Sequence, residues 1–107
     1  MEKIVDRGIL YDAYGSLLTA HQRKIYEDAV YNDLSLTEIA DNEGISKQGV
    51  HDLIRRCTKS LEAYEDKLGM VRRSDRIREA CESLLALTEG EAHALVEDIL
   101  KEISDGI

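Results

Sequence analysis

The chain has 107 residues, with 22 acidic and 14 basic side chains, a formal net charge of −8, and no Pro, Trp or Phe. This length fits one compact domain, or a small domain with a helical extension, and excludes a separate catalytic domain. The acidic balance argues against a general polyanion binder, and the lack of helix breakers and of most aromatic residues favours an all-helical chain.

Two helices are predicted in the first third of the chain. A broken helical pattern covers residues 2–14 and ends at Gly15. Thr19 and Gln22 then form a capping box, in which side chains and backbone amides of the first turn satisfy each other. A second helix therefore starts at Thr19 and closes at Asn32, and its apolar residues at helical spacing are Ile25, Tyr26, Ala29 and Val30.

The next stretch has the pattern of a helix-turn-helix. Ser35 and Glu38 form another capping box, Gly44 allows the chain to leave the first helix sharply, and Ser46 caps the second helix. Glu43 stands where many such motifs place a Leu, which predicts a more hydrated last turn. We expect four apolar side chains to be buried where the helices cross: Ala40, Ile45, Val50 and Leu53.

The second motif helix is predicted to run well past the crossing. A heptad-like apolar seam continues to Leu68, and Gly69 is placed to end the helix. At ~1.5 Å per residue, a helix over residues 46–68 would be roughly 35 Å long. Its far end, which carries Leu61 and Tyr64, must therefore pack on something beyond the motif.

The polar side of this helix is the predicted nucleic-acid contact. The exposed residues at the start of the helix, Asp52 among them, are expected to contact base edges, and the arginines are expected to contact phosphates. The carboxylate of Asp52 would repel phosphate. The predicted nucleic-acid-binding residues are Lys47, Gln48, His51, Arg55, Arg56 and Lys59. A second basic patch is predicted at Arg72, Arg73 and Arg76, although a solvated basic face is the more frequent explanation of such a cluster.

Two further helices complete the predicted chain, over residues 71–87 and from a third capping box, Thr88 with Glu91, to Ile103. We therefore divide the chain into a helix-turn-helix domain, residues 1–69, and a C-terminal helical hairpin, residues 70–107, that packs on it, dimerises, or does both. A homodimer is favoured because one hairpin covers each apolar stripe from one side only. Residues 79–107 carry eight acids and one Lys, which also suits docking to a basic partner.

No feature of the sequence predicts catalysis, a metal site or a cofactor. His21, His51 and His93 are dispersed, and Cys57 and Cys81 lack the spacing of a metal site or a disulfide framework, so both are expected to be packed, reduced thiols. Charges interrupt every apolar run at the N-terminus, which therefore reads as neither a signal peptide nor a membrane span. The expected location is the cytoplasm.

The segment from Tyr11 to Met70 resembles the YlxM family of bacterial proteins and, in its middle part, the helix-turn-helix of sigma factor region 4. The residues that carry the resemblance are Tyr11-Asp12-x-Tyr14-Gly15-Ser16-Leu17-Leu18-Thr19, Gln22, Asp33-Leu34-Ser35-Leu36, Glu38-Ile39-Ala40, Ser46-Lys47-Gln48-Gly49-Val50, Asp52, Arg56 and Tyr64-Glu65-x-Lys67-Leu68. Lys47 stands where an Arg is common, which keeps the charge and loses a two-pronged contact.

The resemblance implies a small all-α protein of the winged-helix-like DNA-binding class without a wing. It also implies a regulatory or accessory role in the signal recognition particle pathway, with the particle's RNA and its GTPase as partners. The motif itself equally favours a DNA-binding transcriptional regulator. The sequence leaves these two functions open.

Overall fold

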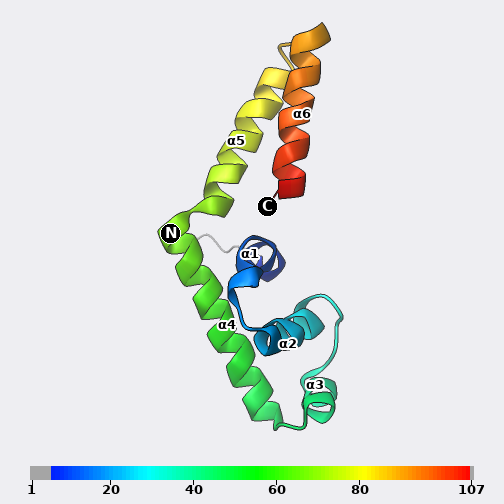
Figure 1. Cartoon of the computed structure of the whole chain (residues 1–107), viewed down its shortest axis with the longest axis vertical. Helices are drawn as coiled ribbons and strands as arrows, with labels where there is room; N and C mark the ends of the chain where they lie inside the picture. The colour runs from blue at the N-terminus through cyan, green and yellow to red at the C-terminus, as the bar shows by residue number, and fades with distance from the viewer. Residues whose placement is uncertain (1–5, 107) are drawn as a thin grey trace. The chain divides into compact units, whose positions relative to one another are not determined.

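The computed structural model describes residues 6–106 of the chain, with side chains up to residue 104. Within this part every regular element is a helix, and the chain divides into two compact units, residues 1–68 and 69–107 (Figure 1). The first unit contains α1 (Arg7–Tyr14), a short 3-10 helix η1 (Gly15–Leu17), α2 (Ala20–Val30), α3 (Leu36–Glu43) and α4 (Lys47–Leu68). The second contains α5 (Met70–Leu85) and α6 (Gly90–Gly106).

The long helix α4 is the support on which the first unit is built. Helices α1, α2 and α3 all pack against it, and in Figure 1 they lie along one side of it. The core that results contains Leu10, Tyr14, Leu18, Ile25, Tyr26, Ile39, Ala40, Val50, Ile54, Cys57 and Leu61. Because α4 contributes buried residues to packing with three other helices, its rotation about its own axis is fixed, and so is the side that it turns to solvent.

Two helix boundaries follow the predicted capping chemistry. Gln22 N donates to Thr19 Oγ1 at 3.1 Å and Thr19 N donates to Gln22 Oε1 at 2.9 Å, so α2 starts on a complete capping box. Gly69 has φ +64°, the left-handed conformation that ends a helix, and it separates α4 from α5 by a single residue. Residues 2–5 of the predicted first helix lie outside the described residues. Among the residues that the structure describes, this helix, α1, begins at Arg7.

Three predictions about packing and capping were wrong. Ile45 is 38% exposed instead of filling the corner of the motif, and Leu53 is half-buried, because Ile54 takes the inward position one residue later. Thr88 does not begin the last helix. Its hydroxyl donates to the Leu85 carbonyl at 3.4 Å, and α6 starts two residues later at Gly90.

Glu43 is less hydrated than predicted. Its side chain is only 16% exposed, and its carboxylate lies 3.8 Å from Lys24 Nζ and 3.5 Å from His21 Nε2, both on α2. Lys24 also forms an ion pair with Asp28 at 3.0 Å. The acid before the turn therefore joins α3 to α2 through charge, where an apolar residue would join them by packing.

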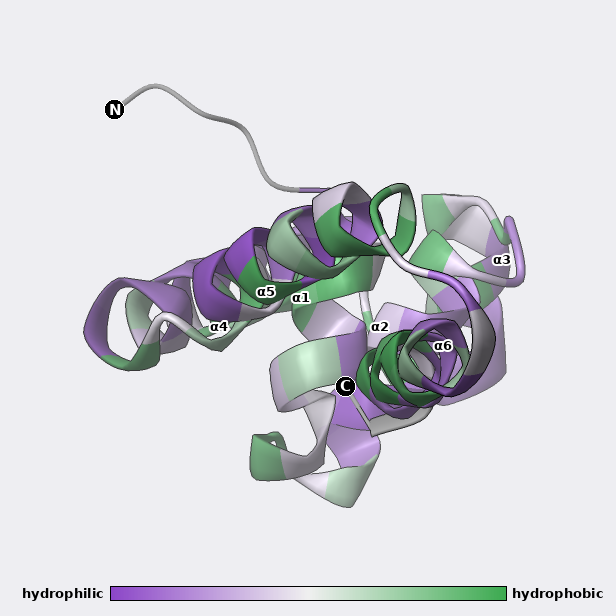
Figure 2. Cartoon of the chain, turned by 90° about the horizontal axis from the view of Figure 1, so that it is seen from above, coloured by the Kyte–Doolittle hydropathy of each residue, from purple (hydrophilic) through white to green (hydrophobic). Residues whose placement is uncertain are grey.

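The second unit is a hairpin of α5 and α6, which pack along each other. Val71, Cys81 and Val96 are its buried apolar residues, and Figure 2 shows hydrophobic and hydrophilic positions on both helices. Several large apolar residues of the hairpin remain exposed: Ile77, Leu84, Leu87, Leu95 and Ile99. Both cysteines of the chain are buried free thiols, as predicted, and burial raises the pKa of the Cys57 thiol.

Candidate nucleic-acid interface

Local capping interactions define the helix-turn-helix at α3 and α4. Glu38 N donates to Ser35 Oγ at 3.1 Å, and Ser35 N donates to Glu38 Oε1 at 2.8 Å, which fixes the start of α3. Gly44 follows α3 with φ +71°, and Gly49 N donates to Ser46 Oγ at 2.9 Å, which caps the start of α4. The connection between the two helices is thereby fixed at the end of α3 and at the start of α4.

Two tyrosine hydroxyls from other helices hold α4 farther along. Tyr14 Oη on α1 donates to Glu65 Oε1 at 2.6 Å, and the hydroxyls of Tyr26 on α2 and Thr58 on α4 lie 2.6 Å apart. Tyr14, Tyr26 and Glu65 are all buried, and burial raises the pKa of the Tyr26 hydroxyl. Bonds between residues so distant in sequence fix the orientation of α4 relative to α1 and α2.

All six predicted nucleic-acid-binding residues lie on α4 and are exposed. Four of them follow one another every four residues: Lys47, His51, Arg55 and Lys59. Each such step advances ~6 Å along a helix and ~40° around it. The four therefore form a basic path roughly 18 Å long that winds gradually around α4. Arg56 stands about 100° around the helix from Arg55, on a different side.

Asp52 is partly neutralised within the predicted interface. Gln48 Nε2 donates to Asp52 Oδ1 at 3.0 Å, and the same oxygen lies 3.7 Å from both Arg55 Nη2 and His51 Nδ1. The hydrogen bond from Gln48 and the neighbouring Arg55 and His51 hold the pKa of the Asp52 carboxyl below its ordinary value. Asp52 therefore stays charged at neutral pH and draws Gln48 and Arg55 toward itself.

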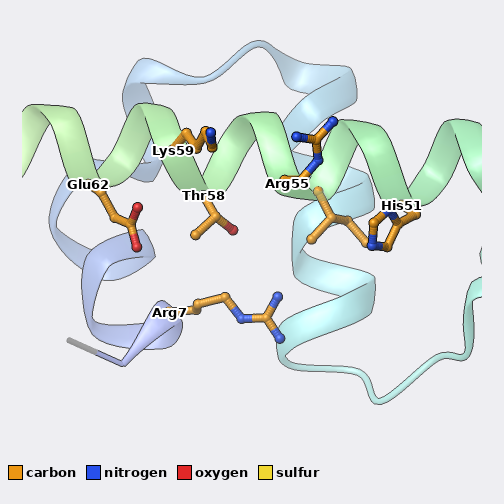
Figure 3. Close-up of a pocket in the computed structure, with 7 residues that line it drawn as sticks. Arg7, His51, Arg55, Thr58, Lys59 and Glu62 are labelled. Atoms are coloured by element: carbon orange, nitrogen blue, oxygen red, sulfur yellow. The ribbon is translucent and has the colours of Figure 1, made fainter. Parts of the chain in front are cut away.

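A cavity of about 350 Å³ opens beside α4, on the side that faces α1 (Figure 3). Its lining residues are Arg7, His51, Ile54, Arg55, Thr58, Lys59 and Glu62. The structure thus brings three of the six predicted residues together with a cation of α1, whereas Lys47, Gln48 and Arg56 do not line the cavity. Sequence reasoning missed Arg7 because no local pattern links it to residues more than forty positions away.

The predicted second basic patch lies on α5, in the other unit. Arg72, Arg73 and Arg76 are exposed in its first two turns. A methyl group added at Gly69 would lie 2.8 Å from Arg72 Nη2, so the guanidinium of Arg72 folds back toward the start of its own helix. Arg78 forms an ion pair with Asp75 at 3.0 Å.

The part of the chain that the structure describes contains no cluster of three His, Cys, Asp or Glu residues arranged to hold a metal ion. None of the helices in residues 6–106 combines the length and the apolar character needed to cross a membrane. The exposed side of α4 and the cavity beside it form the candidate functional site.

Comparisons with known proteins agree with the motif. Residues 1–103 match the model of the UPF0122 family, described as "Putative helix-turn-helix protein, YlxM / p13 like". A UPF0122 protein of Thermoanaerobacter sp. (strain X514) is 40% identical over 105 residues, covering 91% of this chain and 90% of that protein. A UPF0122 protein of Clostridium kluyveri (strain ATCC 8527) is 46% identical over 80 residues, covering 74% and 71%.

The family match extends farther than the resemblance seen in the sequence. It reaches residue 103, so it includes α5 and most of α6 as well as the segment from Tyr11 to Met70. A UPF0122 protein of Geobacillus kaustophilus (strain HTA426) is 43% identical over 84 residues, 78% of this chain and 76% of that protein. The segment that forms the helical hairpin is therefore covered by the family match up to residue 103.

Proposed function

Because the chain belongs to the UPF0122 family of YlxM/p13-like helix-turn-helix proteins, we propose that it binds nucleic acid through the exposed side of α4. The observation that carries this proposal is the basic path of Lys47, His51, Arg55 and Lys59 on a helix whose rotation is fixed by packing. Because the helix backbone is already ordered, binding a phosphate orders only the side chains of these cations. The role is regulatory or accessory.

The physiological partner that we propose is the RNA of the signal recognition particle, with the particle's GTPase as a further partner, in the cytoplasm. This choice rests on the YlxM resemblance. The alternative is DNA, which the helix-turn-helix favours, because the first turn of such a helix reads base edges in a major groove. Gln48 donates one amide hydrogen to Asp52 and keeps its second hydrogen and its amide oxygen, so it is still able to read a base.

We further propose that the α5–α6 hairpin pairs two copies of the chain. Leu84, Leu95 and Ile99 are between 46% and 59% exposed, and Leu87 is 81% exposed, which is a large apolar surface for a hairpin of this length. A two-fold dimer would bury this surface and present two copies of α4. Sedimentation over a range of concentrations tests it, and a species of 12.1 kDa that persists at high protein concentration would rule it out.

The deciding experiment for the proposed function compares labelled RNA of the particle with random-sequence duplex DNA at several salt concentrations. The double variant Arg55→Ala/Arg56→Ala should weaken binding and reduce the slope of log K against log salt by about one for each lost phosphate contact. Lys101→Ala, on α6, removes one exposed positive charge and serves as the control. If the folded double variant binds both probes as tightly as the wild type, α4 is not the contact surface.

A further inference from the structure

The cavity between α1 and α4 has the composition of an anion site. Arg7 on α1 and Arg55 and Lys59 on α4 line it, and among residues 6–104 Glu62 is the one carboxylate that does so. The described part of the lining therefore carries three cationic side chains and one carboxylate, besides His51. Arg55 Nη2 lies 3.7 Å from Asp52 Oδ1, a carboxylate that does not line the cavity.

Arg7 is directed into the cavity and away from its acidic end. Figure 3 shows the side chain of Arg7 running alongside α4 from the end of the cavity that holds Glu62 toward the end that holds His51. Arg7 is the first residue of α1, and its neighbour Asp6 caps that helix by accepting from Gly8 N at 2.6 Å. The cap fixes where the Arg7 side chain leaves α1.

Thr58 supplies a hydroxyl on the same lining. Tyr26 Oη is completely buried, and Thr58 Oγ1, 2.6 Å away, is its hydrogen-bond partner. Either hydroxyl can donate in this contact, and the direction that satisfies the proton of the buried phenol has Tyr26 donating and Thr58 accepting. This arrangement leaves the hydroxyl hydrogen of Thr58, which lines the cavity, to donate to a ligand.

The position of the cavity along α4 fits a backbone phosphate. Arg55 and Lys59 lie eight and twelve residues beyond Lys47, which is ~12 and ~18 Å along the helix axis. In helix-turn-helix proteins the first turn of the second helix is the part that reads base edges. The cavity lies beyond that turn, where the helix is free to contact the backbone of the nucleic acid.

We propose that this cavity binds a phosphodiester group of the bound nucleic acid, held by Arg7 and the Thr58 hydroxyl. Arg55 and Lys59 also line the cavity, and their long side chains, which Figure 3 shows directed away from Arg7, turn toward the bound phosphate. The inference rests on the proposed function and adds Arg7 and Thr58 to the interface. It also separates Arg55, which lines the cavity, from Arg56, which does not.

The test measures binding of a fluorescein-labelled random-sequence DNA duplex and of the labelled RNA of the particle, by anisotropy across a salt series. Arg7→Ala should weaken binding several-fold and lower the salt slope by about one, because one phosphate contact is lost. Lys67→Ala is the matched control, since Lys67 is an exposed cation of α4 that does not line the cavity. It should leave both quantities unchanged.

Glu62→Gln provides a prediction of opposite sign. Removal of the one carboxylate of the lining should tighten binding of the same probes, whereas loss of structure would weaken it. Circular dichroism and urea denaturation establish that each variant remains folded. If Arg7→Ala and Glu62→Gln both bind like the wild type while Lys47→Ala binds more weakly, the cavity proposal is wrong and the proposed function stands. If the wild type binds neither probe, both fail.

Discussion

Replacement of Leu61 by Ala should destabilise the first unit strongly, and replacement of Leu53 should not. Leu61 is completely buried on α4, so Leu61→Ala loses the transfer free energy of its side chain and leaves a cavity, at a cost of ~2–5 kcal/mol. Leu53 is half-buried and stands about 80° around the helix from Leu61. Its truncation should cost less than about 2 kcal/mol, since only part of its apolar area is removed from water.

Tyrosine fluorescence during urea denaturation measures these differences in the first unit alone. All five tyrosines lie between residues 11 and 64, and the chain has no Trp. Helices α5 and α6 therefore contribute nothing to the tyrosine fluorescence. Leu17→Ala is the control, because Leu17 is 55% exposed and its truncation should change stability by less than about 0.5 kcal/mol. A cost at Leu53 equal to or above that at Leu61 would refute the rotation of α4 described above.

Other substitutions test the bonds and turns around α4. Tyr14→Phe should cost ~1.5–3 kcal/mol in urea denaturation, because it removes a buried hydrogen bond to the Glu65 carboxylate; no change in midpoint would contradict a role for that bond. The amide of Asn32, together with a lysine, holds the pKa of the Asp28 carboxyl in the folded protein below its ordinary value. Asp28 therefore stabilises the folded protein at pH values above its ordinary pKa, and this stabilisation is lost as the pH falls through the lower pKa of the folded state. Asp28→Asn should therefore lower stability at neutral pH and flatten its decline in acid, and an unchanged acid limb would argue against this account. Gly44→Ala should cost ~1–2 kcal/mol in thermal denaturation, because φ is +71° there while the space around it is open; a neutral result would mean that the turn adopts another conformation.

The sequence predicts those parts of the fold that short-range chemistry determines. The capping boxes at Thr19 and Ser35 and the turn at Gly44 each depend on residues within three or four positions, so their patterns are readable from the chain alone. The capping box predicted at Thr88 does not form, although its residue types and spacing match the same capping-box pattern. Gly90, at φ +65°, starts the helix later and leaves Thr88 to bond with Leu85.

The parts that the sequence does not predict depend on contacts between distant segments. Periodicity identifies an apolar stripe on α4 but cannot distinguish Leu53 from Ile54 as the inward residue, because the two differ by about 100° and the partner helices decide. The cavity required Arg7 to lie beside residues 51–62, a juxtaposition created by packing of α1 on α4. The six predicted contact residues on α4 remain a prediction that binding experiments must test.

The polar contacts of Glu43 with α2 have an evolutionary consequence. Glu43 contacts Lys24 and His21, and Lys24 also contacts Asp28, so one charged residue at the end of α3 depends on partners in α2. In a descendant that acquires Leu at position 43, the contact becomes apolar and Lys24 loses one of its two acidic partners. Selection on residue 24 is then relaxed. Loss of the lysine at residue 24 alone leaves the Glu43 carboxylate with less positive charge beside it. We therefore expect the two positions to be substituted together in relatives, which a comparison of many sequences measures directly.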